Sequence, residues 1–383
     1  MEMVKRPLPA GFQLVSGDSS TEEYFINMGP QHPATHGVLR LVLRLDGETV
    51  LECVPHLGYI HRGIEKQGES ETFLQYIHLT DRMDYITAHQ NNHSVCLAIE
   101  KAMGIGVPER AEYIRVIVLE LQRLASHLMF LGCFGGDMGA QTALLYGFKE
   151  REIITDIFDE LCGARLTFNY MRPGGVANDI PANFLPRVKK SMETIKRTMD
   201  EFDTLITGNV IIQERSRGIG ILTKENALSY GCTGPTLRAS GVSYDMRKDD
   251  PYSIYDRLDF KVPVYHNGDC FDRYLIRVDE MHQSIHIIEQ CLAQIPSEGF
   301  YRSKEKASYR LPAGSYYAAT ETAKGIFGTY VVAEKGDKPW RIHSRSPNFA
   351  NLSAINEMVK GHMIADVVAV ITTLDVVIPD IDR

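Results

Sequence analysis

The sequence lacks the local patterns by which proteins usually hold a metal or a nucleotide. Its seven cysteines are scattered, and no two of them form a CxxC pair, the usual local signature of zinc and iron–sulfur sites. It has no glycine-rich phosphate loop, no Rossmann fingerprint and no GxSxG elbow. We therefore expect the chain to bind no metal and no dinucleotide of its own.

Basic charge and long apolar runs are also scarce. The net charge of −8 argues against nucleic acid as a partner. The first residues have no apolar core of signal-peptide length, so we expect no secretory signal and take the odd, scattered cysteines as reduced thiols in the cytoplasm. No uninterrupted run reaches the ~18 apolar residues that span a bilayer.

The most apolar stretch, residues 124–148, contains His127, Asp137 and Gln141, and its two glycine clusters are expected to interrupt a helix. A charge such as Asp137 is costly at the centre of a bilayer. We therefore interpret this stretch as buried protein interior, and any contact with a membrane must come through partners.

The periodicity predicts an α+β fold that is mainly α, with a central helical bundle and β-rich N- and C-terminal parts. Asp46-Gly47 indicates a hairpin. Helices are predicted over residues 72–103, from Pro108 onward, and over about 141–161, 186–205 and 269–295, and strands over 316–321, 325–334 and 339–347. The expected parts are residues 1–71 (β-rich), 72–215 (helical bundle), 216–300 (loop-rich and helical) and 301–383 (β-rich).

Three segments are candidates for chemistry. The first, GPQHPATHGVLR, places two histidines in a loop, where His36 could approach a ligand and exchange a proton near neutral pH. From spacing alone, a polar turn is the favoured interpretation. The second, TDRMDYITAHQNNH, makes Asp81 and Tyr85 neighbours if it is helical. Its histidine pair, His89 and His93, has metal-ligand spacing, but we favour buried polar side chains, because no carboxylate completes a site.

The third segment is FLGCFGGDMGAQ. Its Asp137, set among glycines and apolar residues, must be paired, solvated or functional, since an unpaired buried charge is expensive. A cap on the following helix is the structural alternative. By contrast, His282 and His286 are expected on the surface of a charged helix, and the loop at residues 240–259 suggests no chemistry.

Taken together and in order, these motifs resemble one family. GPQHPATHGVLR, GYIHRGIEK, DRMDY, RLASHL, RPGGV, SGVSYD, GDCFDRY and the terminal DIDR are similar to the D subunits of NADH–quinone oxidoreductase (respiratory complex I). That family is related to the large subunit of nickel–iron hydrogenases, in which two CxxC motifs hold the metals. The corresponding segments here, HRGIEK and LDVVIPDIDR, contain no cysteine.

The resemblance implies a quinone-reduction site beside a terminal [4Fe–4S] cluster carried by a neighbouring subunit. His36 and Tyr85 would face the quinone, and Asp137 would hydrogen-bond His36. A carboxylate raises the pKa of a nearby histidine, so that it can hold and release a proton near neutrality. Arg82 would lie near the partner's cluster, where its positive charge favours the reduced state.

The resemblance also implies a departure at the cluster. Many relatives carry a histidine where this chain has Thr167, and no histidine stands close to Thr167 in the sequence. Threonine cannot take up a proton, so we expect that no nearby group takes up a proton when the cluster is reduced. The added negative charge then makes reduction harder and lowers the potential of the cluster. A low potential suits menaquinone rather than ubiquinone as acceptor.

The implied partners are the other components of complex I, namely the iron–sulfur B subunit, the C and I subunits, and the A and H subunits of the membrane arm. The implied location is peripheral, on the cytoplasmic face of the plasma membrane. Two alternatives remain open. The first is a related quinone-reducing complex fed by ferredoxin or another donor, which would have a similar subunit. The second is an assembly protein without a redox site. The joint presence of the three motifs argues against the second, because such a protein has no need of all three.

Overall fold

The computed structural model describes residues 12–14, 23–30, 37–304 and 308–383. It is a mixed fold of helices and sheets, and about half of the chain is helical, in agreement with the expected α+β class. The strands are β1 (Phe12–Leu14), β2 (Glu23–Met28), β3 (Arg40–Asp46), β4 (Thr49–His56), β5 (Met171–Arg172), β6 (Gly175–Val176), β7 (Gly314–Thr322), β8 (Gly325–Ala333) and β9 (Pro339–Arg345).

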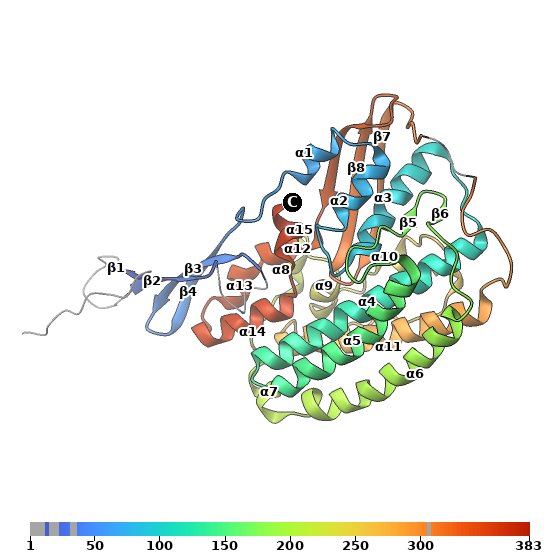
Figure 1. Cartoon of the computed structure of the whole chain (residues 1–383). Coiled ribbons are helices and arrows are strands. Elements are labelled where there is room, and N and C mark those ends of the chain that lie inside the picture. The colour runs from blue at the N-terminus through green and yellow to red at the C-terminus, as the bar shows by residue number, and fades with distance from the viewer. Residues whose placement is uncertain (1–11, 15–22, 31–36, 305–307) are drawn as a thin grey trace, which may run out of the picture.

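The helices carry the numbering of Figure 1. They are α1 (Ile64–Gly68), α2 (Phe73–Thr80), α3 (Ala88–Met103), α4 (Glu109–Asp137), α5 (Gln141–Cys162), α6 (Phe184–Phe202), α7 (Val210–Glu214), α8 (Lys224–Ser229), α9 (Pro235–Ala239), α10 (Met246–Asp249), α11 (Cys270–Gln294), α12 (Pro347–Ser353), α13 (Ile355–Val359), α14 (Ile364–Leu374) and α15 (Ile378–Asp382). A π-helical turn, η2 (Asp203–Thr207), continues α6, and a 3₁₀ turn, η3 (Tyr255–Arg257), lies in the 240–259 loop.

Strands β1 to β4 form an antiparallel sheet that projects from one side of the body (Figure 1). The hairpin predicted at Asp46-Gly47 joins β3 to β4 and is confirmed. Alternate residues of β3, namely Leu41, Leu43 and Leu45, are fully buried, as the period-2 pattern requires. This face of the sheet packs on helix α13 near the end of the chain.

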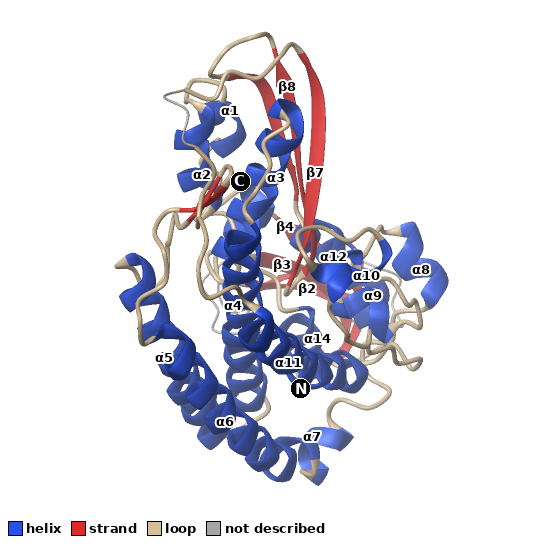
Figure 2. Cartoon of the chain, turned by 90° about the vertical axis from the view of Figure 1, so that its right-hand side faces the viewer, coloured by secondary structure: helices blue, strands red, loops and turns tan. Residues whose placement is uncertain are grey.

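Four long helices, α4, α5, α6 and α11, lie alongside one another below the second large sheet (Figures 1 and 2). Helix α4 is long and apolar enough to cross a bilayer, but 89% of its most apolar window is buried inside the protein. The expectation of buried interior for residues 124–148 is thus confirmed for its α4 part. Five of the seven free cysteines are buried as small core residues.

The expectation that the glycine clusters interrupt a helix in residues 124–148 is wrong for the cluster that precedes Asp137. Helix α4 runs through Gly132, Gly135 and Gly136 and ends only at Asp137. The glycines let α4 and α5 pack closely, because a Cβ on Gly147 of α5 would lie 2.6 Å from the carbonyl oxygen of Leu128. Close helix packing outweighs the small intrinsic cost of glycine in a helix.

The predicted helix over residues 72–103 is also wrong at one place. It is divided into α2 and α3 by a non-helical segment, residues 81–87, so Asp81 and Tyr85 are not neighbours on a helix. In this segment Asp84 Oδ1 accepts a hydrogen bond from the amide of Ile86 at 3.1 Å, which is a local alternative to helical bonding.

The C-terminal sheet of β7, β8 and β9 is confirmed, and its strands pack against α3. After β9 the chain is helical, from α12 to α15. Helix α14 contacts both α4 and α11, so the end of the chain lies against the bundle. A residue of α12 also reaches the 81–87 segment, since Asn348 Nδ2 lies 3.4 Å from Asp84 Oδ2.

Candidate functional site

Tyr85 is half-buried in the 81–87 segment between α2 and α3. Burial raises the pKa of its phenol, and the negative charge of the preceding Asp84 adds to the effect. Cys133 and Asp375 also act on this phenol, so both lie within electrostatic range of it. The phenol therefore keeps its proton at neutral pH and can donate a hydrogen bond to a ligand.

Asp137 is the last residue of α4 and is half-buried. Its carboxylate accepts a hydrogen bond from the hydroxyl of Thr372 on α14 at 2.5 Å. The alternative that Asp137 caps the following helix is wrong, because the N-cap of α5 is Ala140 and no side chain caps it. A contact with α14, rather than a helix cap, therefore orients this carboxylate.

Cys133 links these two predicted site residues. It lies one turn before Asp137 on α4, and its thiol is within electrostatic range of Asp137, Asp375 and Lys324. Burial raises the pKa of this thiol to about 11, so it is a neutral group at physiological pH. Since Tyr85 is also within range of Cys133, the fold brings Tyr85 and Asp137 into one neighbourhood.

His36 lies outside the described residues, so its predicted contact with Asp137 is not part of the structure. The next residue, Gly37, is described, and a Cβ there would lie 3.2 Å from Ile378 of α15. The chain after His36 therefore passes close to α15, the helix that holds Asp380.

The guanidinium of Arg82 lies on the surface and donates to the carbonyl oxygen of His78 at 2.7 Å. Thr167 is half-buried in the loop that follows α5. The two residues belong to adjoining segments, because His78 Nε2 and Asn169 Nδ2 lie 2.9 Å apart. Both residues predicted to face a partner's cluster thus lie in one part of the molecule.

No histidine stands close to Thr167 in the sequence, but two histidines contact the residues that follow it in the fold. His78 contacts Asn169, and the ring of His89 stacks on Phe168 with centroids 4.1 Å apart. His89 is fully buried, and burial lowers its pKa to about 3, so it stays neutral. The favoured interpretation of His89 and His93 as buried polar side chains is confirmed.

A further titratable group near Thr167 was missed from the sequence. Asp81 is fully buried, and burial raises its pKa to about 7, against the opposing effects of Asn92 and Arg82. One carboxylate oxygen accepts from Asn92 Nδ2 at 2.6 Å, and the backbone of Asn169 also acts to lower the pKa of this carboxyl. No periodicity in the sequence indicates this burial, because it depends on the break between α2 and α3.

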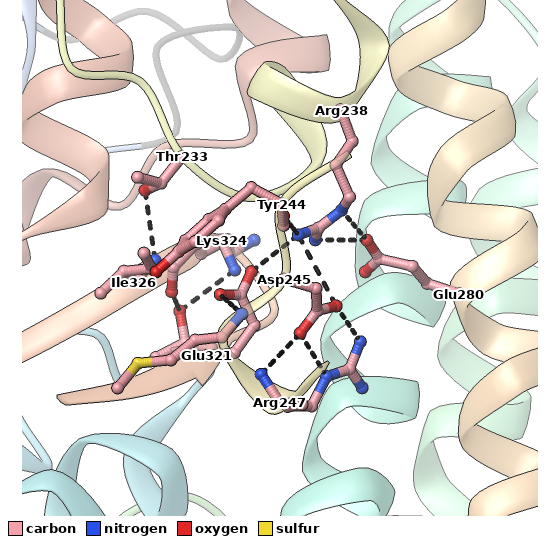
Figure 3. A network of polar contacts seen from close by, with 12 residues as sticks. Thr233, Arg238, Tyr244, Asp245, Arg247, Glu280, Glu321, Lys324 and Ile326 are labelled. Atoms are coloured by element: carbon pink, nitrogen blue, oxygen red, sulfur yellow. Dashed lines mark hydrogen bonds and ion pairs between the residues drawn. The ribbon is translucent and has the colours of Figure 1, made fainter. Parts of the chain in front are cut away.

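The 240–259 loop, for which the sequence suggested no chemistry, is part of a buried ionic network (Figure 3). Arg238 lies 2.5 Å from Glu280, 2.9 Å from Glu321 and 3.7 Å from Asp245. Arg247 bonds to Asp245 at 2.6 Å. Every carboxylate named here has an arginine partner, which indicates a structural framework rather than a reactive site.

A second arginine–glutamate group continues this network into α4. Although burial opposes ionisation, Arg123 and Arg247 hold the pKa of Glu120 at about 2. His282 and His286 are exposed on α11, as predicted. In the part of the chain that the structure describes, no group of three His, Cys, Asp or Glu side chains is placed to hold a metal ion.

The HRGIEK segment and the last residues of the chain lie against each other. His61 Nδ1 is 2.6 Å from the carbonyl oxygen of Asp382, and the amide of Gly63 donates to a carbonyl oxygen of Arg383 at 3.2 Å. Neither segment offers a thiolate, so the contact is made by backbone groups, ion pairs and hydrogen bonds.

Comparison with known proteins identifies the family. A sequence-family model described as the 49 kDa subunit of respiratory-chain NADH dehydrogenase matches residues 137–310 and 300–383. The D subunit of the NADH-quinone oxidoreductase of Desulforamulus reducens is 51% identical over 362 residues, which cover 94% of this chain and 99% of the relative. The corresponding protein of Dehalococcoides mccartyi is 49% identical over 364 residues, covering 95% and 99%.

A fused relative shows the same similarity. The combined C/D subunit of the NADH-quinone oxidoreductase of Bacteroides fragilis is 50% identical over 361 residues, which cover 94% of this chain and 68% of the relative. The chain therefore belongs to the family of the 49 kDa subunit of respiratory-chain NADH dehydrogenase, as a counterpart of the D subunits of NADH–quinone oxidoreductase.

Proposed function

We propose that this chain forms the quinone-reduction site of a proton-pumping NADH–quinone oxidoreductase, beside a [4Fe–4S] cluster held by a partner subunit. The observation that carries the proposal is the shared neighbourhood of Tyr85 and Asp137. Their segments are about fifty positions apart, and the fold brings both within electrostatic range of Cys133. The D-subunit relatives are named as parts of an enzyme that reduces quinone, which agrees with this assignment.

The chemistry of quinone reduction suits these side chains. Two electrons place negative charge on the two carbonyl oxygens, and two protons must follow. Tyr85, whose burial keeps its phenol protonated, donates to one oxygen. His36 donates to the other, and Asp137 favours the cationic form of that histidine. The hydrogen bond from Thr372 holds the Asp137 carboxylate in place for this role.

Loss of the proton from His36 would leave the charge of Asp137 poorly compensated. We propose that this imbalance couples quinone reduction to proton transfer in the membrane arm. Asp137 lies at the end of a helix and against α14, so a change in its charge acts on two elements of the bundle at once.

The cluster of the partner would lie beside Arg82 and Thr167, which belong to adjoining surface segments. This arrangement requires an iron–sulfur partner, the B subunit, together with the C and I subunits and the A and H subunits of the membrane arm. The complex would hold the chain at the cytoplasmic face of the membrane. We further propose a fold related to the nickel–iron hydrogenase large subunit, supported by the contact between His61 and the last residues of the chain.

The substitution Tyr85→Phe in the assembled complex tests the site. We expect quinone reduction to be abolished, because the phenyl ring cannot donate a hydrogen bond, while electron transfer from NADH to an artificial acceptor continues. Tyr317→Phe is the matched control, since Tyr317 is a partly exposed tyrosine on β7. Near-normal quinone reduction in Tyr85→Phe would overturn the proposal.

A further inference from the structure

Two buried carboxyl groups, one of them adjacent to Tyr85 in the chain, are linked by a shared hydrogen-bond donor. Asp84 precedes it in the chain and is 1% exposed, and Asp380 on α15 is fully buried. The side-chain amide of Asn348 on α12 joins them, since its Nδ2 lies 2.7 Å from Asp380 Oδ2 and 3.4 Å from Asp84 Oδ2. Two acidic groups from opposite ends of the sequence thus share one hydrogen-bond donor.

The pair differs from the buried glutamates of the ionic networks in having no ion-pair partner among the described residues. Arginine lies 2.5 Å from both Glu100 and Glu280, whereas no ion pair to Asp84 or Asp380 occurs among the described residues. The remaining donors to the pair are neutral, such as the hydroxyl of Ser346, which bonds to Asp380. Two uncompensated charges at this depth would be expensive.

The charged groups that face the pair do not neutralise it. Lys324 and Asp375 act on Asp84, but they form an ion pair with each other. Arg383 acts on Asp380 from a distance, while its guanidinium bonds to Ser344. Arg345 also interacts with Asp380, while its guanidinium bonds to Thr233. Among the described residues, the positive charges that act on the pair are therefore each paired with, or bonded to, another group.

The hydrogen-bond pattern around the pair leaves room for one more proton. Asp380 Oδ1 and Asn348 Oδ1 are both buried, and neither has a hydrogen-bond donor among the residues that the structure describes. A proton on one carboxyl supplies a donor and removes one of the two charges. Burial raises the pKa of both groups, that of Asp380 to about 6 with the charge of Asp84 adding to the effect. Because the two groups interact, they titrate as a unit.

We propose that Asp84 and Asp380 share one proton and act as a proton reserve for Tyr85. This inference rests on the proposed function. When two electrons from the partner's cluster reduce the quinone, the Tyr85 O–H bond breaks and its proton goes to one quinone oxygen, while the second proton comes from His36. The Tyr85 phenolate then takes the proton of the pair, which leaves both carboxylates ionised until a proton from water restores the pair.

Infrared spectroscopy of the assembled complex tests the shared proton. The C=O band of a carboxylic acid is absent from a carboxylate, so we expect a wild-type band that disappears as the pH is raised through a range centred on about 6 or somewhat higher. Either Asp84→Asn or Asp380→Asn should weaken this band or shift its titration. The exposed Asp200→Asn is the matched control and should leave the band unchanged. A wild-type band identical to that of both variants at every pH would overturn the inference.

Turnover measurements test the link to Tyr85. We expect Asp84→Asn and Asp380→Asn to slow quinone reduction on the order of a hundredfold and to remove its decline as the pH rises through the range in which the pair loses its proton, because the reserve no longer titrates. Electron transfer from NADH to an artificial acceptor should not change. An unaltered pH profile in both variants would contradict the reserve role.

The two proposals fail separately. If Tyr85→Phe retains quinone reduction, the proposed function is refuted. The infrared band still reports whether the carboxyl pair holds a proton. If Tyr85→Phe is inactive but the band is absent, only the proton reserve is refuted.

Discussion

Asp137 and Thr372 are 235 positions apart in the sequence, and the hydroxyl of Thr372 donates a 2.5 Å hydrogen bond to the carboxylate of Asp137. The bond joins the C-terminal end of α4 to α14. It favours one rotamer of the Asp137 side chain, which the small residues at the glycine-rich end of α4 would not restrict. The proposed partner of His36 is thus oriented by a residue close to the end of the chain.

From this arrangement we predict that Asp137→Asn lowers quinone turnover about tenfold or more without dissociating the complex. The reason is that the neutral amide no longer stabilises a cationic His36, and a fall of about one unit in the pKa of that histidine corresponds to a factor of about ten. The amide keeps the shape of the carboxylate and a contact with Thr372 but carries no charge. Thr372→Val should have a smaller effect, and Thr194→Val at a partly exposed position on α6 should have none. A steady-state rate and pH profile that do not change in Asp137→Asn would make Asp137 a purely structural residue.

The ionic network around Arg238 should contribute to stability rather than to catalysis. Arg238→Ala leaves Glu280, Glu321 and Asp245 buried without this cation. Breaking a buried pair typically costs about 3–5 kcal/mol, so we predict a large fall in the thermal unfolding temperature or failure of assembly. The exposed pair of Arg257 and Glu109 gives the control, since Arg257→Ala should change the unfolding temperature little. Equal stability of the two variants would show that the network is dispensable.

The glycine contact between α4 and α5 should also be sensitive. A Cβ on Gly147 would lie 2.6 Å from the carbonyl oxygen of Leu128 and 3.0 Å from Gly132 Cα, both of them backbone atoms that cannot rotate away. We predict that Gly147→Ala destabilises the protein by about 1–3 kcal/mol and lowers quinone turnover, because α4 carries Asp137. Gly106→Ala is the control, since its Cβ would meet nothing within 4 Å. Wild-type thermal stability in Gly147→Ala would contradict this packing argument.

The long helices and the hairpins could be predicted because their residues repeat with the period of the element. The break at residues 81–87 could not, because it depends on Asp84 bonding to the amide of Ile86 inside a buried site. The surroundings of Asp137 could not either, because Thr372 reaches it only after α14 has packed on α4. The local sequence pattern predicts helices and strands. The hydrogen-bond partners of a buried polar group cannot be predicted in this way, because they depend on how elements that are distant in the sequence pack together.

The same limit applies around Thr167. No histidine stands near it in the sequence, whereas in the fold Asp81 and His78 lie beside the segment that follows it. The buried Asp81, with a pKa of about 7, is half-protonated at neutral pH. His78 has its pKa lowered by burial and by Arg172 and Arg82, so it is mostly neutral there. If the partner's cluster lies here, we predict that Asp81, and not a histidine at position 167, takes up a proton when the cluster is reduced.

A redox titration of the terminal cluster in the assembled complex at several pH values tests this prediction. We expect the potential of the wild-type cluster to fall with rising pH, with a slope that approaches but does not exceed about 59 mV per pH unit, the limit for one proton per electron. The raised pKa places this slope around and above pH 7, because a reduced cluster favours the protonated carboxyl. Asp81→Asn should flatten the slope there, His78→Asn should alter it only at more acidic pH, and Thr167→Val should leave it unchanged. A potential independent of pH in the wild type would instead restore the expectation drawn from Thr167, namely an uncompensated cluster of low potential.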